Sequence, residues 1–173
     1  MCVPEQANPT ITGFSAAEQA AWYAGLPTMY GSAAALFTNP AGQVLLVKPN
    51  YHDHWSLPGG ILDHGEPPHV ACRREVAEEL GVDLVPGPLL AVDWSAPAGE
   101  RPRPIVSFVF DGGVLPDDAP IRLQEEELDD YRFVGPGELD RYLPSFLFVR
   151  VSGALAGRAA GAAVYLPGRS GVP

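Results

Sequence analysis

The apolar positions of the chain change their spacing from strand-like to helical in its first half. Two apolar runs, 31–38 and 43–48, are separated by the turn-forming segment Asn-Pro-Ala-Gly at 39–42, which predicts a β-hairpin. Residues 67–80 instead carry apolar side chains at helical spacing, with prolines confined to the first turn. Gly81 follows this run and is placed to end it, so we expect the clearest helix of the chain there.

The segments on either side predict a mixed set of strands and helices around this helix. A capping box at Ser15-Ala-Ala-Glu18 opens a short helix through about Ala24. The other expected elements are strand-like segments at 55–57, 82–95, 105–110 and 128–134, loops at 96–104 and 111–126, helices at 137–142 and 144–160, and an edge strand at 162–166. This order favours an α/β fold, an α/β/α sandwich with a mixed sheet. We expect a flexible arm over 1–13 and a single domain over 14–173.

Composition and charge limit the classes of molecule that the chain is expected to bind. The chain has 173 residues, of which 46% are hydrophobic and 18% charged, as in a globular protein. Its net charge of −10 repels a polyphosphate backbone, so we expect no binding of polymeric nucleic acid. No apolar run of membrane-spanning length and no signal peptide is evident, so we expect no membrane association and a cytoplasmic location. The two cysteines, Cys2 and Cys72, do not form a disulfide framework.

The predicted central helix carries three carboxylates on one face. Glu75, Glu78 and Glu79 stand at i, i+3 and i+4, and each like-charged pair costs about 0.2–0.5 kcal/mol on an exposed helix. Arg74 can pair with Glu78 but does not balance all three charges. A hard divalent cation would balance them, because magnesium prefers oxygen ligands. The alternative is a solvated acidic face, which an isolated cluster of this kind would favour.

The residues around these carboxylates form a longer motif. From Gly60 to Val82 the chain contains Gly-x5-Glu-x7-Arg-Glu-U-x-Glu-Glu-x-Gly-U, where U is aliphatic. This segment resembles the Nudix box at every required position, and the preceding Trp-Ser-Leu-Pro-Gly-Gly at 55–60 resembles the usual lead-in of that family. The resemblance implies a Nudix-like α/β/α sandwich with a central Nudix helix. It also implies hydrolysis of a phosphoanhydride bond in a nucleoside diphosphate-linked or related nucleotide.

The resemblance also implies roles for individual residues. Glu78 and Glu79 would be the principal metal ligands, Glu75 would bind metal or help to activate water, and a carbonyl of Gly59 or Gly60 would complete the shell. Arg74 would take part in the catalytic set by orienting the helix and loop, with Glu66 as structural support. The expected cofactor is Mg²⁺, with Mn²⁺ as a substitute.

Outside the Nudix box, the candidate functional residues are isolated in the sequence, and each also has a non-functional interpretation. Glu127, in the acidic run 125–127, is the expected base or additional ligand, and a solvated loop is its alternative. Four further residues are expected to bind substrate, by stacking or by phosphate contact, although residues of these kinds are more often core or surface residues: Tyr51, Trp55, Trp94 and Arg101. His52 and His54 are interpreted as loop or pocket residues rather than a zinc pair.

Two classes of function follow. The first is an active pyrophosphohydrolase acting on a small phosphorylated, nucleotide-like substrate. The second is a Nudix-fold module that senses a nucleotide without cutting it. The intact set of Glu75, Glu78 and Glu79 favours the enzyme. A related isomerase is less compatible with an unaltered box. The substrate and the oligomeric state stay open, a homodimer being one alternative.

Overall fold

The structure is a computed structural model, and it describes residues 13–168. Except for Gly13, the arm expected over 1–13 lies outside the described residues, as does Cys2. The helices and strands are, in chain order, α1 (Ala16–Ala24), β1 (Tyr30–Thr38), β2 (Val44–Pro49), β3 (Gly59–Ile61), α2 (Pro68–Leu80), β4 (Leu89–Ser95), β5 (Ile105–Val114), β6 (Leu128–Val134), the 3-10 helix η1 (Pro136–Arg141), α3 (Ser145–Ala160) and β7 (Val164–Leu166).

One seven-stranded sheet runs through the molecule in the order β6-β2-β1-β5-β4-β7, and β3 also pairs with β1. The pairs β1·β5 and β4·β7 are parallel, whereas the others are antiparallel. One edge of β1 is shared, because β2 pairs with it at Thr38 and β3 pairs with it at Ser32, Ala33 and Ala34. The mixed sheet expected from the sequence is confirmed.

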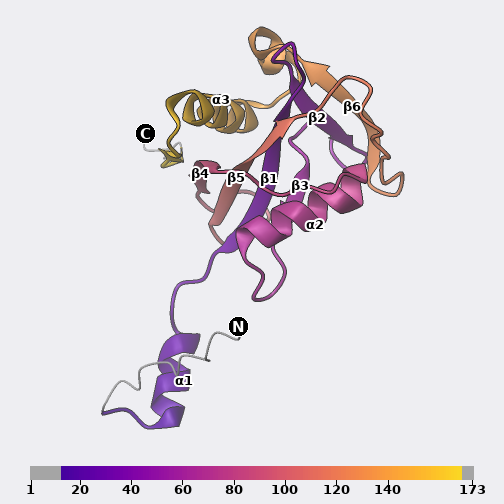
Figure 1. Cartoon of the computed structure of the whole chain (residues 1–173). Helices are drawn as coiled ribbons and strands as arrows, with labels where there is room; N and C mark the ends of the chain where they lie inside the picture. Colours follow the sequence, from indigo (N-terminus) through magenta and orange to yellow (C-terminus); the bar gives the residue numbers. More distant parts are fainter. Residues whose placement is uncertain (1–12, 169–173) are drawn as a thin grey trace.

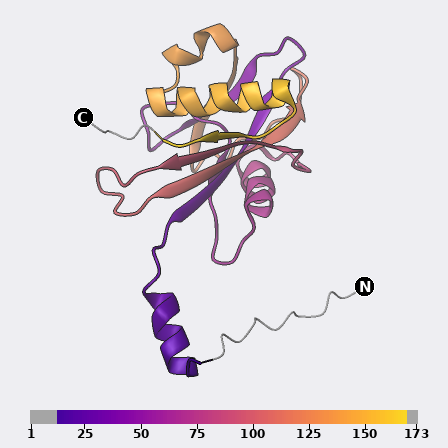
Figure 2. The same cartoon turned by 90° about the vertical axis from the view of Figure 1, so that its left-hand side faces the viewer.

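Helices cover both faces of this sheet (Figure 1, Figure 2). Successive residues of β1 point to opposite faces, so Ala33, Ala35 and Phe37 pack with the apolar side of α2. Leu36 points to the other face and packs with Leu139 of η1 and with three residues of α3: Leu147, Val151 and Ala154. The α/β/α sandwich is therefore confirmed.

The apolar arc of α2 anchors that helix to the sheet. Cys72, Val76 and Leu80 are fully buried, as the helical spacing predicts. Burying a side chain of this size stabilises the fold by about 1.5–3 kcal/mol, so this arc fixes the orientation of the opposite, acidic arc. Burial also raises the pKa of the Cys72 thiol to about 12, which leaves it protonated and unreactive.

The strand expected over 82–95 is wrong in its first half, because β4 begins only at Leu89. Pro86 and Pro88 have no N–H to donate to a ladder. Leu84 still enters the core beside α2, while Val85 is 81% exposed. The segment before β4 is thus a core-contacting loop, and its apolar residues resemble a strand only in composition.

Three other boundaries differ from expectation. β5 continues to Val114, past the expected end at 110, because β1 supplies a parallel partner as far as Thr38. The helix expected over 137–142 is a 3-10 helix over Pro136–Arg141. Residues 55–57 pair with β2 only through a bridge between Val47 and Ser56.

Helix α1 forms as its capping box predicts, with the Glu18 backbone N–H donating to the Ser15 hydroxyl. It nevertheless has no buried residue and projects from the body of the molecule (Figure 2). Among residues 13–168, none of the helices is both long enough and apolar enough to cross a membrane.

Candidate active site

The site is built on the contact between β3 and β1. Gly59 has φ 141°, and a Cβ placed there would lie 2.5 Å from the Cα of Ala34. Only a glycine permits this approach, which pairs Gly59 with Ala34 and Gly60 with Ala33. The backbone of β3 is therefore held directly against the central strand.

Gly60 leaves room for a carboxylate of α2. A Cβ at this position would lie 2.5 Å from the carboxyl carbon of Glu75, so the side chain of Glu75 occupies that space. Burial raises the pKa of Glu75, and an ion pair with Arg74 opposes that rise. The two glycines have different tasks, since Gly59 serves the fold and Gly60 serves the position of Glu75.

Substituting the two glycines should separate these tasks. We expect Gly59→Ala to lose about 3 kcal/mol or more of stability, because its φ is unfavourable and its Cβ meets backbone. Gly60→Ala should stay folded but lose about 100-fold in turnover, because only the movable Glu75 side chain must shift. Urea unfolding and steady-state kinetics measure both effects.

The matched control is Gly42→Ala. Gly42 has φ 77° but no atom near its Cβ position, so only the backbone cost of about 1–2 kcal/mol applies. Wild-type turnover in Gly60→Ala would show that the position of Glu75 is not critical.

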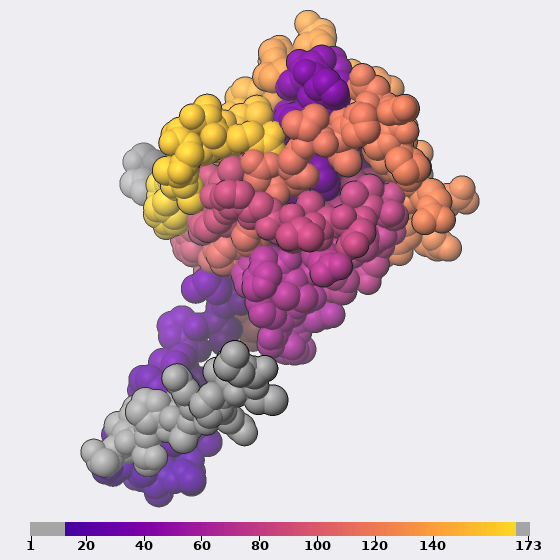
Figure 3. Space-filling view, viewed as in Figure 1, coloured from indigo at the N-terminus to yellow at the C-terminus, as the bar shows by residue number. Residues whose placement is uncertain are grey.

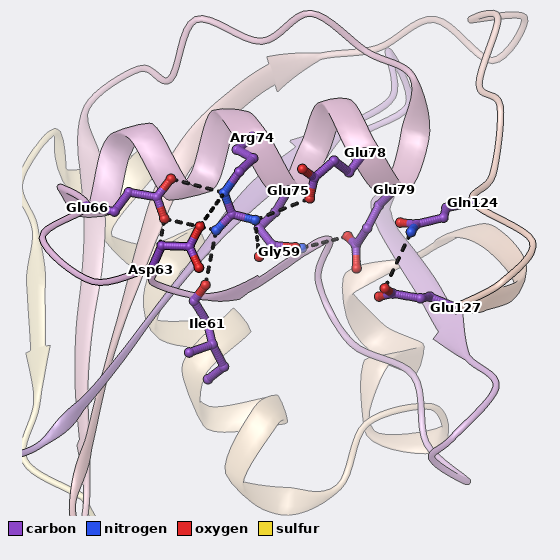
Figure 4. Close-up of polar contacts among 10 residues, drawn as sticks. All are labelled: Gly59, Ile61, Asp63, Glu66, Arg74, Glu75, Glu78, Glu79, Gln124 and Glu127. Atoms are coloured by element: carbon purple, nitrogen blue, oxygen red, sulfur yellow. Dashed lines mark hydrogen bonds and ion pairs between the residues drawn. The ribbon is translucent and has the colours of Figure 1, made fainter.

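Arg74 is the centre of an ion-pair network at the start of the site (Figure 4). Its guanidinium lies 2.9 Å from Glu66, 2.8 Å from Glu75 and 3.2 Å from Glu78. It also donates to the Ile61 carbonyl of β3 at 3.1 Å. These contacts tie the loop before α2, the strand β3 and the helix together.

Glu66 is strongly stabilised as an anion. It accepts hydrogen bonds from the Arg74 guanidinium and, at 2.9 Å, from the Asp63 backbone N–H. These bonds lower the pKa of Glu66 to about 2. Glu66 is therefore a permanent counter-ion that fixes Arg74 and the loop.

Glu79 is the least accessible of the three helix carboxylates. It is 5% exposed and accepts a hydrogen bond from the Gly59 N–H at 2.8 Å. Burial, and then the neighbouring carboxylates, raise the pKa of Glu79 to about 8 despite that bond. A buried carboxylate beside other carboxylates is a donor that a cation would stabilise.

Glu127 approaches the same place from a different segment. The loop before β6 is attached to the end of α2, because the Gln124 N–H donates to the Glu79 carbonyl at 3.1 Å and the Arg122 N–H to the Leu80 carbonyl at 2.9 Å. The two segments are adjacent at the surface in Figure 3. Glu127 helps to raise the pKa of both Glu79 and Glu75, and Figure 4 shows its carboxylate beside that of Glu79.

The donor set fits a hard divalent cation. Within residues 13–168 no three acidic, His or Cys side chains already converge as a metal cage. The carboxylates do not converge because each already has a partner. Arg74 pairs with Glu75 and Glu78, and Glu79 accepts a hydrogen bond from the Gly59 amide. One guanidinium nevertheless faces an excess of carboxylates, and the atoms that these carboxylates offer to a metal are all oxygens. These residues could hold Mg²⁺ after small side-chain movements.

Of the expected substrate residues, the structure brings Tyr51 to the carboxylates. Burial, then Glu79, Glu127 and Glu75, raise the pKa of Tyr51, although its side chain is 62% exposed. Trp55 is instead packed on the α3-side core, in edge contact with Tyr142 at 5.8 Å. The guanidinium of Arg132 lies 5.4 Å from the ring centre of Trp55, so that ring already has partners.

Trp94 and Arg101 have local partners. Trp94 lies on β4, which β5 separates from β1, and a Cβ on Gly168 would meet its carbonyl and ring. Arg101 donates to the carbonyls of Ser95, Ala96 and Arg103, all in or next to its own loop. Substrate contact by these two residues stays a prediction, and the hydrogen bonds of Arg101 hold the β4–β5 connection.

Some contributing residues were not singled out from the sequence. Asn50 donates from its backbone to the Glu127 carbonyl at 2.9 Å and from its side chain to the Glu126 carbonyl at 2.8 Å. Gln124 lies 3.4 Å from the Glu127 carboxylate. Neither residue has a periodic or motif signal. Only their position next to Tyr51 and Glu127 in the sequence could have suggested them.

Comparison with known proteins agrees with this geometry. The family model described as the NUDIX domain matches residues 29–149. The chain belongs to the Nudix family. The expected class, a Nudix pyrophosphohydrolase, is thereby confirmed, and Nudix hydrolases generally use divalent metal ions. The matched range begins after α1, so the projecting helix lies outside the Nudix core.

Two relatives illustrate the range of the family. This Nudix protein is 30% identical over 144 residues to an uncharacterized Nudix hydrolase, orf19, of Rhodococcus erythropolis, covering 78% of this chain and 75% of that one. It is 43% identical over 61 residues to the RNA pyrophosphohydrolase of Psychrobacter cryohalolentis, covering 34% of this chain and 35% of that one. The second match is confined to a short segment, which is about a third of the relative's length.

A solved structure shows the same fold. The Nudix domain of Shewanella oneidensis NrtR, complexed with ADP ribose, superposes with a TM-score of 0.65 at 20% identity. The match covers 84% of this chain and 99% of that chain. At this identity the likeness shows the fold alone.

Proposed function

We propose that this Nudix protein is a Mg²⁺-dependent hydrolase that cuts the phosphoanhydride bond of a small nucleoside diphosphate-linked substrate. The observation that carries the proposal is the buried Glu79, held at the Gly59 amide among Glu75, Glu78 and Glu127 with no basic partner of its own among the described residues. Such a group is costly in a resting protein and useful as an anionic cation ligand.

Each residue has a distinct task in this proposal. Glu79, Glu78 and Glu75 would hold Mg²⁺, or Mn²⁺ in its place, with a carbonyl of Gly59 or Gly60. When bound, the metal supplies neutralisation of the bridging phosphates and a more acidic water. Arg74 and Glu66 keep the loop and helix in register. Glu127 would accept the proton of the attacking water.

The small size of the substrate follows from charge. The chain carries −10, and the site itself is acidic, so a polymeric phosphate backbone would be repelled. A single diphosphate can be admitted because the metal compensates its charge. The ADP ribose held by the Nudix domain of NrtR is a ligand of this size.

The proposal is tested with a panel of nucleoside triphosphates, nucleotide sugars and dinucleotides. We expect phosphate or nucleotide release with Mg²⁺, retained in part with Mn²⁺ and abolished by EDTA. ³¹P NMR of the products in H₂¹⁸O identifies the bond that is cut. Tight nucleotide binding without turnover across the panel would favour the sensing module instead.

The role of Glu127 has its own test. We expect Glu127→Gln to lower kcat about 10²–10⁴-fold, because a general base is lost. The matched control is Glu126→Gln, one residue away in the same exposed loop, which should keep wild-type kinetics. A kcat within threefold of wild type in Glu127→Gln would show that Glu127 is not the general base.

A further inference from the structure

Four aromatic rings lie in a row beside the carboxylates, and we define them as the ring row. The centre of the Tyr51 ring is 4.7 Å from that of His52, which is stacked on His54 at 4.9 Å with an interplanar angle of 16°. His54 then meets Phe146 of α3 edge-on at 6.0 Å. The row runs from the acidic site to the first turn of α3.

The ring row is held in place at both ends of its loop. At the base, Val47 and Ser56 exchange backbone hydrogen bonds of 2.9 and 3.0 Å. Lys48 Nζ donates to the carbonyl of Pro49 at 3.1 Å and also to that of His52. Asn50 ties the loop to the segment that carries Glu127. A loop fixed in this way presents its rings with little loss of entropy on binding.

The two terminal rings are open to solvent. Tyr51 is 62% exposed and Phe146 is 53% exposed, so part of each ring is available for contact. Tyr51 is also the aromatic residue on which Glu79, Glu127 and Glu75 act directly through their charges. An open ring face therefore stands next to the group of carboxylates that would bind a metal-diphosphate.

We propose that the ring row, through Tyr51, is the platform on which the nucleobase of the substrate stacks. The inference rests on the proposed function, because the diphosphate at the carboxylates brings the base near Tyr51. One ribose separates a base from its diphosphate, so the base must find a partner close to the metal ligands. Trp55 is engaged by Arg132 and Tyr142, whereas Tyr51 offers a free face. Offset or edge contacts between π-systems favour this addition to the row.

The test compares Mg²⁺-ADP with Mg²⁺-pyrophosphate, which share a diphosphate and differ by adenosine. Isothermal titration with the full chain should show ADP binding about tenfold or more tightly than pyrophosphate. Tyr51→Leu should remove this difference, whereas Tyr51→Phe should retain it. The matched control is Tyr165→Leu, because Tyr165 is 64% exposed on the edge strand β7 and is equally accessible.

The histidines provide a second readout. The chain has four, of which His52 and His54 belong to the ring row, while His64 lies in the loop before α2 and His69 in the first turn of α2. In ¹H–¹³C spectra, ADP but not pyrophosphate should move the His52 and His54 ring signals, with His64 and His69 much less affected. This ring-current effect is measured in the wild-type protein. It is therefore independent of any disturbance of the fold by a Tyr51 substitution.

Three results would overturn the platform: ADP binding no better than pyrophosphate, an ADP preference that survives Tyr51→Leu, or no ADP binding at millimolar concentration. These outcomes are independent of turnover. A protein that stacks ADP without hydrolysing any substrate would contradict the proposed function and leave the platform supported.

Discussion

Glu79→Gln should abolish most metal-dependent turnover while leaving the protein folded. A magnesium site supplies several kcal/mol of charge stabilisation, which corresponds to a loss of about 10²–10⁴-fold in kcat when an anionic ligand becomes neutral. The amide oxygen of Gln can still accept the hydrogen bond from Gly59, which is 2.8 Å long in the wild type. The measurement is steady-state kinetics across a Mg²⁺ titration.

The stability of Glu79→Gln should increase although its activity decreases. Glu79 is buried beside Glu75, and its ionisation is opposed by its surroundings. Glu79→Gln removes this penalty, so the urea midpoint of the metal-free protein should rise above that of the wild type as the pH increases from 4.5, with the full gain reached above pH 8. Glu138→Gln, at an exposed position on η1, is the control and should change neither quantity. Turnover within threefold of wild type in Glu79→Gln would show that Glu79 is not an essential ligand.

Arg74→Met should lower the stability of the fold substantially, because it removes the shared partner of several carboxylates. The guanidinium side chain is only 28% exposed, and its partners Glu66 and Glu75 are 12% and 15% exposed. Removing one partner of a buried ion pair costs about 3–5 kcal/mol, and the partial exposure here reduces the expectation to about 2–3 kcal/mol. Urea unfolding at pH 7 measures it.

The preceding residue is a matched control. Arg73 pairs with Asp83 at 2.8 Å, but the two side chains are 56% and 82% exposed. Arg73→Met should therefore cost no more than about 1 kcal/mol, although it removes the same charge from the same helix. Equal losses in the two variants would contradict the central role of the Arg74 network.

The same network predicts a pH dependence. The pKa of Glu66 is about 2 in the folded protein and about 4.5 when unperturbed, so the unfolded chain binds more protons between these values. The stabilisation from Glu66 is therefore fully present above pH 4.5 and is lost as the pH falls toward 2. In Arg74→Met the pKa of Glu66 should return toward normal, and stability should depend less steeply on pH in this window.

Local features of the chain were predictable because their causes lie within a few residues. The spacing of Glu75, Glu78 and Glu79 places them on one side of α2 in any context that forms a helix. The hairpin between β1 and β2, the capping box of α1 and the helix end at Gly81 likewise depend on short-range geometry. These predictions were confirmed.

Features that depend on distant partners were not predictable. The Pro-containing segment 82–88 resembles a strand in composition, but its prolines and its contact with α2 keep it outside the sheet. β5 extends to Val114 only because β1 lies parallel to it. Composition could not distinguish Tyr51, Trp55 and Trp94 as stacking candidates, since each is an aromatic residue in or near a strand.

The sequence by itself determined the acidic helix and its family, because the Nudix box from Gly60 to Val82 is contiguous and its geometry is helical. Tertiary structure decided what meets that helix. It buries Glu79 against Gly59, brings Glu127 in from a separate loop and sets Tyr51 beside the carboxylates while Trp55 turns into the core. These contacts join residues far apart in the chain, and only packing of the sheet against its helices selects them.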